Sequence, residues 1–289
     1  ALLAVAGGLA AAVVEHRKRR RRARAALNDG KPRVALCACG SVAAVKAPYI
    51  AQALILGPGG AAPSADSVYV DLVLTQSAGF FQRVLYRKAR PQRLLDELLA
   101  LTDAEGTPYL QVWTDEDEWR DYAEVGGAEG TGRVLHIDLA KRNRVLVFAP
   151  LSANTLAKLA LGLCDNLASC LARAWEWDAD GDAATEDGGS STASSFLSED
   201  GTPLVVVEES ERPVIVRGGP RDKPVVLAPA MNTVMWNQSV TQQHLSVLRD
   251  RGAEVITPAV KLLACGDRGK GALASVEEIV ERVREALVA

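Results

Sequence analysis

Residues 33–46 read RVALCACGSVAAVK, and this stretch decides the fold. Its first half is a short apolar run typical of a buried strand, and from Val42 onward its composition favours a helix. Gly40 and Ser41 lie between the two, where the N–H groups that begin a helix favour an anion such as phosphate. The stretch therefore predicts the first strand-to-helix unit of a parallel sheet; the alternative for Gly40 and Ser41 is a capped turn without a ligand.

The same alternation continues along the chain. We expect strands at Arg33–Cys39, Ser67–Leu74, Arg144–Ala149, Lys223–Ala228 and Ala253–Thr257, and helices at Val42–Leu56, Asn154–Leu161, Asp165–Trp175, Asn237–Arg251 and Val276–Val288. Short apolar runs that alternate with longer helical segments are typical of βαβ units. The sequence predicts an α/β fold, a single Rossmann-like (flavodoxin-like) domain with a mostly parallel sheet and helices on both faces.

The 289 residues suit one large domain with appendages. We assign residues 32–289 to it, and residues 1–31 to an apolar and basic extension that is disordered or helical. The apolar run of residues 1–14 is shorter than the roughly 20 residues of a membrane-spanning helix, so no membrane span is expected. The basic run of residues 17–24 is interpreted as a solvated tail, with a nuclear-localisation signal or an anionic surface contact as the alternative.

Residues 176–221 interrupt the pattern with an acidic segment. Residues 176–212 hold eleven acids against one base, and the net charge of the chain is −3. Such a segment has too little apolar surface to offset the entropy of ordering. We interpret it as a mobile insertion, either tolerated loop growth or a regulatory docking arm. Without this segment and the basic run of residues 17–24, the remaining body is nearly neutral, and we expect no nucleic-acid partner.

The five cysteines are an odd number without a C-x-x-C pair, so neither a disulfide framework nor a zinc ribbon is indicated. We expect a reducing, cytoplasmic setting and no metal site. Cys37 and Cys39 are predicted to be buried near the first strand, and Cys164 and Cys170 to belong to the core.

Small polar residues follow four of the predicted strands. They are Gly40 and Ser41; Thr75, Gln76 and Ser77; Ser152, Ala153, Asn154 and Thr155; and Ala230, Met231 and Asn232. The carboxyl ends of parallel strands share one edge of a sheet, where open α/β sheets bind ligands. Hydroxyl and amide groups with almost no charge suit a flat polar heteroaromatic ring whose phosphate is held by backbone. The dinucleotide motif G-x-G-x-x-G and the P-loop motif are both absent.

Six stretches carry a family resemblance: GSVAAVK (40–46), LHIDL (135–139), APLSANTLAK (149–158), GLCDNL (162–167), PAMNTVMW (229–236) and ACGDRGKGA (264–272). On these the chain resembles the homo-oligomeric flavin-containing cysteine decarboxylases, most closely the eukaryotic members whose substrate is 4'-phosphopantothenoylcysteine. The resemblance implies FMN-dependent decarboxylation to 4'-phosphopantetheine in coenzyme A biosynthesis, through thiol oxidation, loss of carbon dioxide and reduction of an enethiolate. It also implies a cytoplasmic homotrimer with its sites at subunit boundaries.

The resemblance assigns roles residue by residue. It implies His136 as the catalytic base, Asn232 as the amide that holds the substrate carboxylate and Cys265 as the proton donor. Imidazole is the side chain that accepts a proton near pH 7; His16 and His244 are expected to be satisfied or solvent-facing. The implied FMN contacts are Gly40, Ser41, Val42, Thr75, Gln76, Ser77, Phe80, Ser152, Ala153, Asn154, Thr155 and Ala230, and the implied substrate contacts are Asn232, Met231, Leu262, Ala264, Leu273 and Lys141.

Two positions depart from the pattern of the family's plant members. Leu262 stands where they carry Arg, and Leu273 where they carry Met, so the resemblance supports the substrate contacts less firmly than the flavin contacts.

Relatives in some fungi are inhibitory subunits of a Ser/Thr protein phosphatase, which makes such a regulator the main alternative. An enzyme for a peptide's C-terminal cysteine, or a flavin prenyltransferase relative, is a further alternative.

Overall fold

The computed structural model describes residues 31–57, 59–83, 90–120, 134–176, 223–262 and 268–288, except for the side chains of Leu262 and Arg268. The predicted extension and the acidic insertion lie outside these ranges, apart from Lys31 at the end of the first and Glu176 at the start of the second. Within these ranges, no helix combines the length and the apolar character that a membrane crossing requires.

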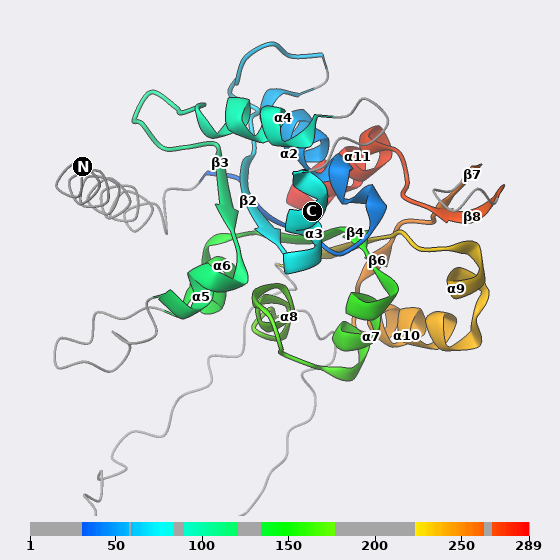
Figure 1. The fold of residues 1–289 in the computed structure, drawn as a ribbon. Coiled ribbons are helices and arrows are strands. Elements are labelled where there is room, and N and C mark those ends of the chain that lie inside the picture. Colours follow the sequence, from blue (N-terminus) through cyan, green and yellow to red (C-terminus); the bar gives the residue numbers. More distant parts are fainter. Residues whose placement is uncertain are drawn as a thin grey trace, which may run out of the picture.

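A six-stranded parallel sheet forms the centre of the molecule (Figure 1). Its strands are β1 (Arg33–Ala38), β2 (Tyr69–Leu74), β3 (Leu110–Trp113), β4 (Val145–Leu151), β5 (Val225–Pro229) and β6 (Glu254–Val255), in the spatial order β3-β2-β1-β4-β5-β6. The succession reverses direction between β1 and β4, as in doubly wound sheets, and ligands bind at such a reversal. The Rossmann-like prediction is confirmed.

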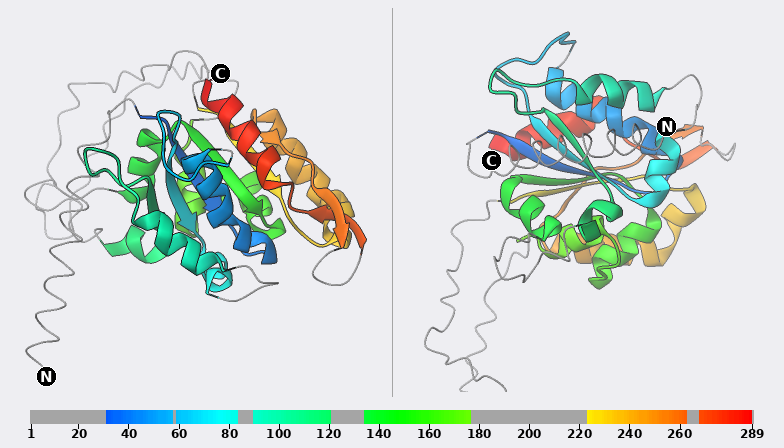
Figure 2. Two further views of the ribbon diagram at one scale, coloured as in Figure 1. Left: turned by 90° about the horizontal axis from the view of Figure 1, so that it is seen from above. Right: turned by 60° about the vertical axis from the view of Figure 1, so that its left-hand side comes forward.

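Helices cover both faces of the sheet (Figure 2). The helices are the 3₁₀ turn η2 (Val42–Lys46), α2 (Ala47–Leu56), α3 (Gln76–Gln82), α4 (Pro91–Leu99), α5 (Asp115–Arg120), α6 (Leu135–Arg142), α7 (Ala153–Leu161), α8 (Leu167–Arg173), α9 (Thr233–Asn237), α10 (Ser239–Asp250) and α11 (Val276–Val288). Helices α2, α4 and α11 contribute to the core on one face, and α6, α7, α8 and α10 to the core on the other.

The alternation of side chains along each strand supplies both cores. In β1, Val34 and Leu36 belong to the core under α2 and α11, whereas Ala35 and Cys37 belong to the core under α7 and α8. A parallel strand covered on both faces reads as a continuous apolar run. This is why the strands were visible in the sequence.

Several elements were not predicted. The sequence between Gln76 and Arg142 contains α3, α4, β3, α5 and α6, and Ala259–Leu262 (β7) pairs with Arg268–Ala272 (β8) in an antiparallel hairpin. The strand β3 has only four residues and the helices six to nine, too short for periodicity to reveal. The prediction that Cys164 and Cys170 are core residues is wrong, because Cys164 is exposed and Cys170 half-buried beside the α7–α8 turn.

A buried carboxylate anchors α6 to the sheet. Asp71 in β2 accepts hydrogen bonds from Trp113 Nε1 at 2.8 Å, Arg142 Nε at 2.8 Å and Asn143 Nδ2 at 2.9 Å. The side chains of Asp71 and Arg142 are only 3% and 6% exposed. A buried charge is tolerated when it is paired and hydrogen-bonded. The pair therefore fixes the carboxyl end of α6 against β2.

We expect Asp71→Asn to lower the free energy of unfolding by about 3–5 kcal/mol, because it leaves the buried Arg142 guanidinium without its counter-charge. Urea denaturation of the full chain measures this loss. The matched control is Arg93→Ala, which removes an exposed pair with Glu97 and should cost no more than about 0.5 kcal/mol. Equal losses in the two variants would contradict the anchoring role of Asp71.

The residues that flank the acidic insertion lie together at the side of the sheet opposite the carboxyl ends of the strands. Trp175, just after α8, donates its Nε1–H to the backbone oxygen of Lys223 at 2.9 Å, and the Lys223 ammonium lies 5.1 Å from the Trp175 ring centre. Lys223 also donates to the backbone oxygen of Ala140. Because β5 begins two residues later, the insertion joins the domain at the amino ends of the strands.

We expect a linker of about six residues in place of residues 177–222 to raise the free energy of unfolding by up to about 2 kcal/mol, because a shorter loop loses less entropy on closure. Chemical denaturation of the two chains tests this expectation. When Trp175→Ala is combined with this replacement, the increase in the free energy of unfolding should disappear, because the contact between Trp175 and Lys223 is lost. A shortened chain that fails to fold would show that the insertion is part of the domain.

Candidate functional site at the carboxyl ends of the strands

A cavity of about 540 Å³ lies at the carboxyl ends of β1, β2, β4 and β5. Ligand pockets in proteins typically enclose about 300–1,000 Å³. The lining residues that the sequence predicted are Gly40, Ser41, Thr75, Gln76, Ser77, Ser152, Ala153, Asn154, Thr155, Ala230 and Met231; Asp115, Lys158, Asp165, Asn166 and Met235 line it as well. The predicted convergence of four strand ends is therefore present.

Each of these strand ends is followed by a capped helix. The side-chain oxygens of Ser41, Thr75 and Ser152 accept backbone N–H groups of η2, α3 and α7 at 3.3, 3.3 and 3.2 Å. Asn232 Oδ1 does the same for Val234 in α9 at 2.7 Å. Such caps start a helix and direct its first N–H groups outward. The amino ends of several helices and several hydroxyl groups therefore lie at the edge of the cavity, an arrangement that suits an anionic ligand.

Gly40 allows the first two loops to touch. A Cβ atom at this position would lie 2.6 Å from Ser77 Cβ, closer than Cβ atoms approach in real structures. The loops after β1 and β2 therefore form one continuous wall of the cavity, and a side chain at position 40 would force these loops apart.

Charged residues also reach the cavity, although the sequence indicated almost none. The Lys158 ammonium donates a hydrogen bond to the Asp165 carboxylate. This bond holds the pKa of Asp165 below its ordinary value. Asp115, after β3, accepts the backbone N–H of Leu167 at 2.9 Å. Lys158 follows Asn154 by four residues, a spacing that places both on one side of α7. This spacing from a predicted site residue could have identified Lys158 as a further lining residue.

A buried thiol lies close to Thr155 and Ser152 on the cavity wall. Cys39 is fully buried, and burial raises its pKa to about 11 in spite of hydrogen bonds from Thr155 and Ser152. The group is therefore a thiol at neutral pH. Thiolates are the reactive form of cysteine, so Cys39 acts here as a packing residue.

Several predicted site residues lie outside the cavity lining. Val42 begins η2, Phe80 is 56% exposed on α3, and Lys141 is exposed on α6. Leu273 is buried in the core on the α2 and α11 face, a position set by its packing just before α11. Leu262 lies in β7 without a described side chain, and Ala264 and Cys265 lie outside the described residues. The roles proposed for these residues stay predictions.

The hairpin that leads to Cys265 docks against the loop after β5. Met231, which lines the cavity, donates its N–H to the Gly271 oxygen at 2.9 Å. Gly271 has φ 145°, and a Cβ there would lie 2.3 Å from the Met231 oxygen; a Cβ at Gly269 would lie 2.3 Å from Thr233 Oγ1. Two glycines thus let β8 lie directly on the loop that carries Asn232.

His136 is the second residue of α6, a helix that the sequence had not indicated. Its Nδ1 lies 2.6 Å from Glu118 Oε1, and its side chain is 18% exposed. His136 does not line the cavity of its own chain. Within the described part of the chain, the predicted base is therefore not among the residues that line the cavity with the predicted cofactor contacts.

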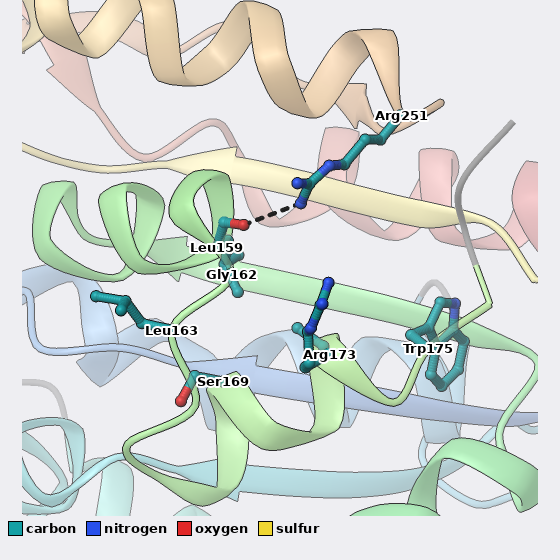
Figure 3. A pocket seen from close by; sticks show the side chains of 8 residues that line it. Leu159, Gly162, Leu163, Ser169, Arg173, Trp175 and Arg251 are labelled. Carbon is teal, nitrogen blue, oxygen red and sulfur yellow. Dashed lines mark hydrogen bonds between the residues drawn. The ribbon is translucent and has the colours of Figure 1, made fainter. Parts of the chain in front are cut away.

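A second pocket lies between α7, α8 and α10 (Figure 3). Arg251 donates to the Leu159 oxygen there at 3.2 Å, near the end of α7, and Arg173 and Trp175 also line the space. Its volume is only about 30 Å³, which is room for very few water molecules. The larger cavity is therefore the candidate ligand site.

We expect Gly40→Ala to lower the free energy of unfolding by about 1–3 kcal/mol, because its methyl group forces the two loops apart. The matched control is Gly79→Ala in α3, where a Cβ would meet nothing within 4 Å and a helical alanine should add up to about 1 kcal/mol. Urea unfolding curves compare the variants. A neutral Gly40→Ala would show that the loops are not in forced contact.

The sequence and the fold match known proteins. The family described as Flavoprotein matches residues 22–180 and 213–288. Phosphopantothenoylcysteine decarboxylase of Arabidopsis thaliana is 34% identical over 254 residues, which are 88% of this chain and 84% of the relative.

Two solved structures share the architecture. A cysteine-to-serine variant of PPC decarboxylase complexed with pantothenoylaminoethenethiol has a TM-score of 0.59 and 33% identity, covering 90% of this chain and 100% of that chain. The FMN binding protein AtHal3 has a TM-score of 0.55 and 33% identity, covering 88% and 96%. The chain belongs to the flavoprotein family, together with the phosphopantothenoylcysteine decarboxylases.

Proposed function

We propose that the chain is an FMN-dependent decarboxylase of 4'-phosphopantothenoylcysteine. The observation that carries this proposal is the cavity in which the loops after β1, β2, β4 and β5 meet. Its lining contains most of the residues that the family resemblance assigns to FMN. The similarity to phosphopantothenoylcysteine decarboxylases over most of the chain supports the choice of substrate.

The residues present fit FMN. The capped helix starts at Ser41, Thr75 and Ser152 supply N–H and hydroxyl groups for a phosphate. The close contact of the first two loops at Gly40 forms a wall against which a phosphate can lie. Asn154 and Asn166 bring amide groups to the cavity, and amides can serve the polar edge of a heteroaromatic ring.

FMN held by the residues around Ser41, Thr75 and Ser152 would supply hydride transfer from and back to the carbon that bears the substrate thiol. His136 takes the thiol proton as the carbon is oxidised, and the thioaldehyde next to the carboxylate then makes loss of carbon dioxide easy. A carboxylate accepts hydrogen bonds, so the Nδ2 amide of Asn232 orients it while Oδ1 caps α9. Cys265 gives a proton to the remaining enethiolate; this role stays a prediction.

We further propose a homotrimer whose sites lie between subunits. The separation of His136 from its own chain's cavity supports this assembly, because a neighbouring chain can then supply the base. Beside Glu118, Trp119 is 68% exposed, and large exposed apolar side chains often mark interfaces. A cytoplasmic location, with the basic run of residues 17–24 as a candidate nuclear signal, stays a prediction.

The purified chain should show a yellow flavin spectrum, sediment as three chains, and release carbon dioxide from 4'-phosphopantothenoylcysteine. His136→Asn should keep its FMN and its assembly but lose carbon dioxide release by at least about 100-fold, because general-base catalysis contributes about 10²–10⁴. Flavin absorption and a carbon dioxide assay on the same preparation measure both quantities.

Two other outcomes would contradict the proposal. A flavin-bound oligomer that releases no carbon dioxide, but inhibits a Ser/Thr phosphatase, would assign the chain to the regulatory relatives. Release of carbon dioxide only from a peptide with a C-terminal cysteine would assign a different substrate. Loss of flavin from His136→Asn would show that His136 is a structural residue.

A further inference from the structure

Glu118 is a buried carboxylate to which the proposed reaction assigns no role. It lies in α5, and its side chain is 5% exposed, whereas Glu116 in the same helix is exposed. A buried carboxylate is costly unless it is paired and hydrogen-bonded. The groups that pair with Glu118 therefore indicate its role.

Both carboxylate oxygens of Glu118 bind the same residue. Oε1 lies 2.6 Å from His136 Nδ1, and Oε2 accepts the backbone N–H of His136 at 3.1 Å. His136 is in the first turn of α6, where an unpaired N–H and the positive end of the helix dipole favour a negative charge. One carboxylate thus fixes the main chain and the ring of His136 together.

This contact determines which ring nitrogen carries the proton. An ionised carboxylate accepts hydrogen bonds and donates none. The proton of a neutral His136 ring must then lie on Nδ1, and Nε2 carries the lone pair. A base that acts through Nε2 is ready in this arrangement, as in catalytic triads where a buried carboxylate holds the histidine tautomer.

The helices that carry the pair are fixed by other contacts. The carboxyl end of α6 is held by the Asp71–Arg142 pair. The first turn of α5 is held by Asp115, which accepts the N–H of Leu167. Burial raises the pKa of the Cys170 thiol in α8 to about 11, and nearby acidic groups, Glu118 among them, raise it further. Cys170 is therefore a neutral thiol at neutral pH and places no charge beside Glu118.

We propose that Glu118 is a positioning residue for the decarboxylation, which holds His136 in the Nδ1–H tautomer with Nε2 as the proton acceptor. This inference rests on the proposed function, because it assigns His136 the role of the base. It adds a residue in α5 to the catalytic machinery, 18 positions before His136.

The test compares Glu118→Gln with Glu116→Gln in the full-length holoenzyme. The amide introduced by Glu118→Gln has nearly the shape of the carboxylate, but its NH₂ group can donate to Nδ1 and so favours the opposite tautomer. Glu118→Gln should lower kcat for carbon dioxide release about 10²–10⁴-fold, with KM and FMN content unchanged. Glu116→Gln removes the same charge from the same helix and should leave kcat within about two-fold.

A spectroscopic readout is independent of catalysis. Protein labelled with ¹⁵N-histidine, with His136→Asn used to assign the signal, should show His136 as the Nδ1–H tautomer in the wild-type chain and the Nε2–H tautomer in Glu118→Gln. An unchanged tautomer, or a kcat loss no larger than the loss of FMN, would overturn the inference. If the wild-type chain releases no carbon dioxide, the proposed function fails and with it the role in catalysis, while the spectra still decide whether Glu118 orients His136.

Discussion

The parallel direction of the strands is the constraint on which the rest of the structure depends. It brings the carboxyl ends of β1, β2, β4 and β5 to one edge of the sheet, so residues as distant in sequence as Gly40 and Ala230 line one cavity. Each strand there runs into a helix whose first N–H groups face that edge, and a side-chain oxygen of Ser41, Thr75, Ser152 or Asn232 starts the helix. The anion-binding character of the site is thus a property of the topology.

A second set of contacts places His136, the proposed base. Asp71 fixes the carboxyl end of α6 to the sheet through Arg142 and Asn143, and Glu118 fixes its amino end through His136. The helix is short, with eight residues, and isolated helices of this length are unstable in water. Buried charges at both ends therefore give α6 a position that its own sequence would not maintain. The cavity and His136 belong to separate parts of one fold, which the proposed assembly of several chains would bring together.

The sequence predicted the structure best where a residue pattern has a single physical cause. The continuous apolar strands and the small polar residues at their ends predicted the sheet and most of the cavity, because burial on two faces and helix capping both leave a clear pattern. The short elements β3, α5 and α6 left no such pattern, since contacts distant in sequence stabilise them. Glu118 lies in the acidic run DEDE (115–118), which resembles a solvated surface; only the fold reveals that one member is buried against His136. Asp165 was hidden in the same way, because it reaches the cavity through its pairing with Lys158 across the α7–α8 turn.

In the proposed enzyme, the flavin lies at the shared edge of β1, β2, β4 and β5, and a neighbouring chain supplies His136. A crystal structure of the full-length protein as purified, with its flavin retained, tests this placement most directly. The FMN phosphate should lie among the backbone N–H groups near Ser41, Thr75 and Ser152, and His136 of another subunit should face the ring. An FMN bound elsewhere, or a His136 distant from every flavin in the assembly, would contradict this placement.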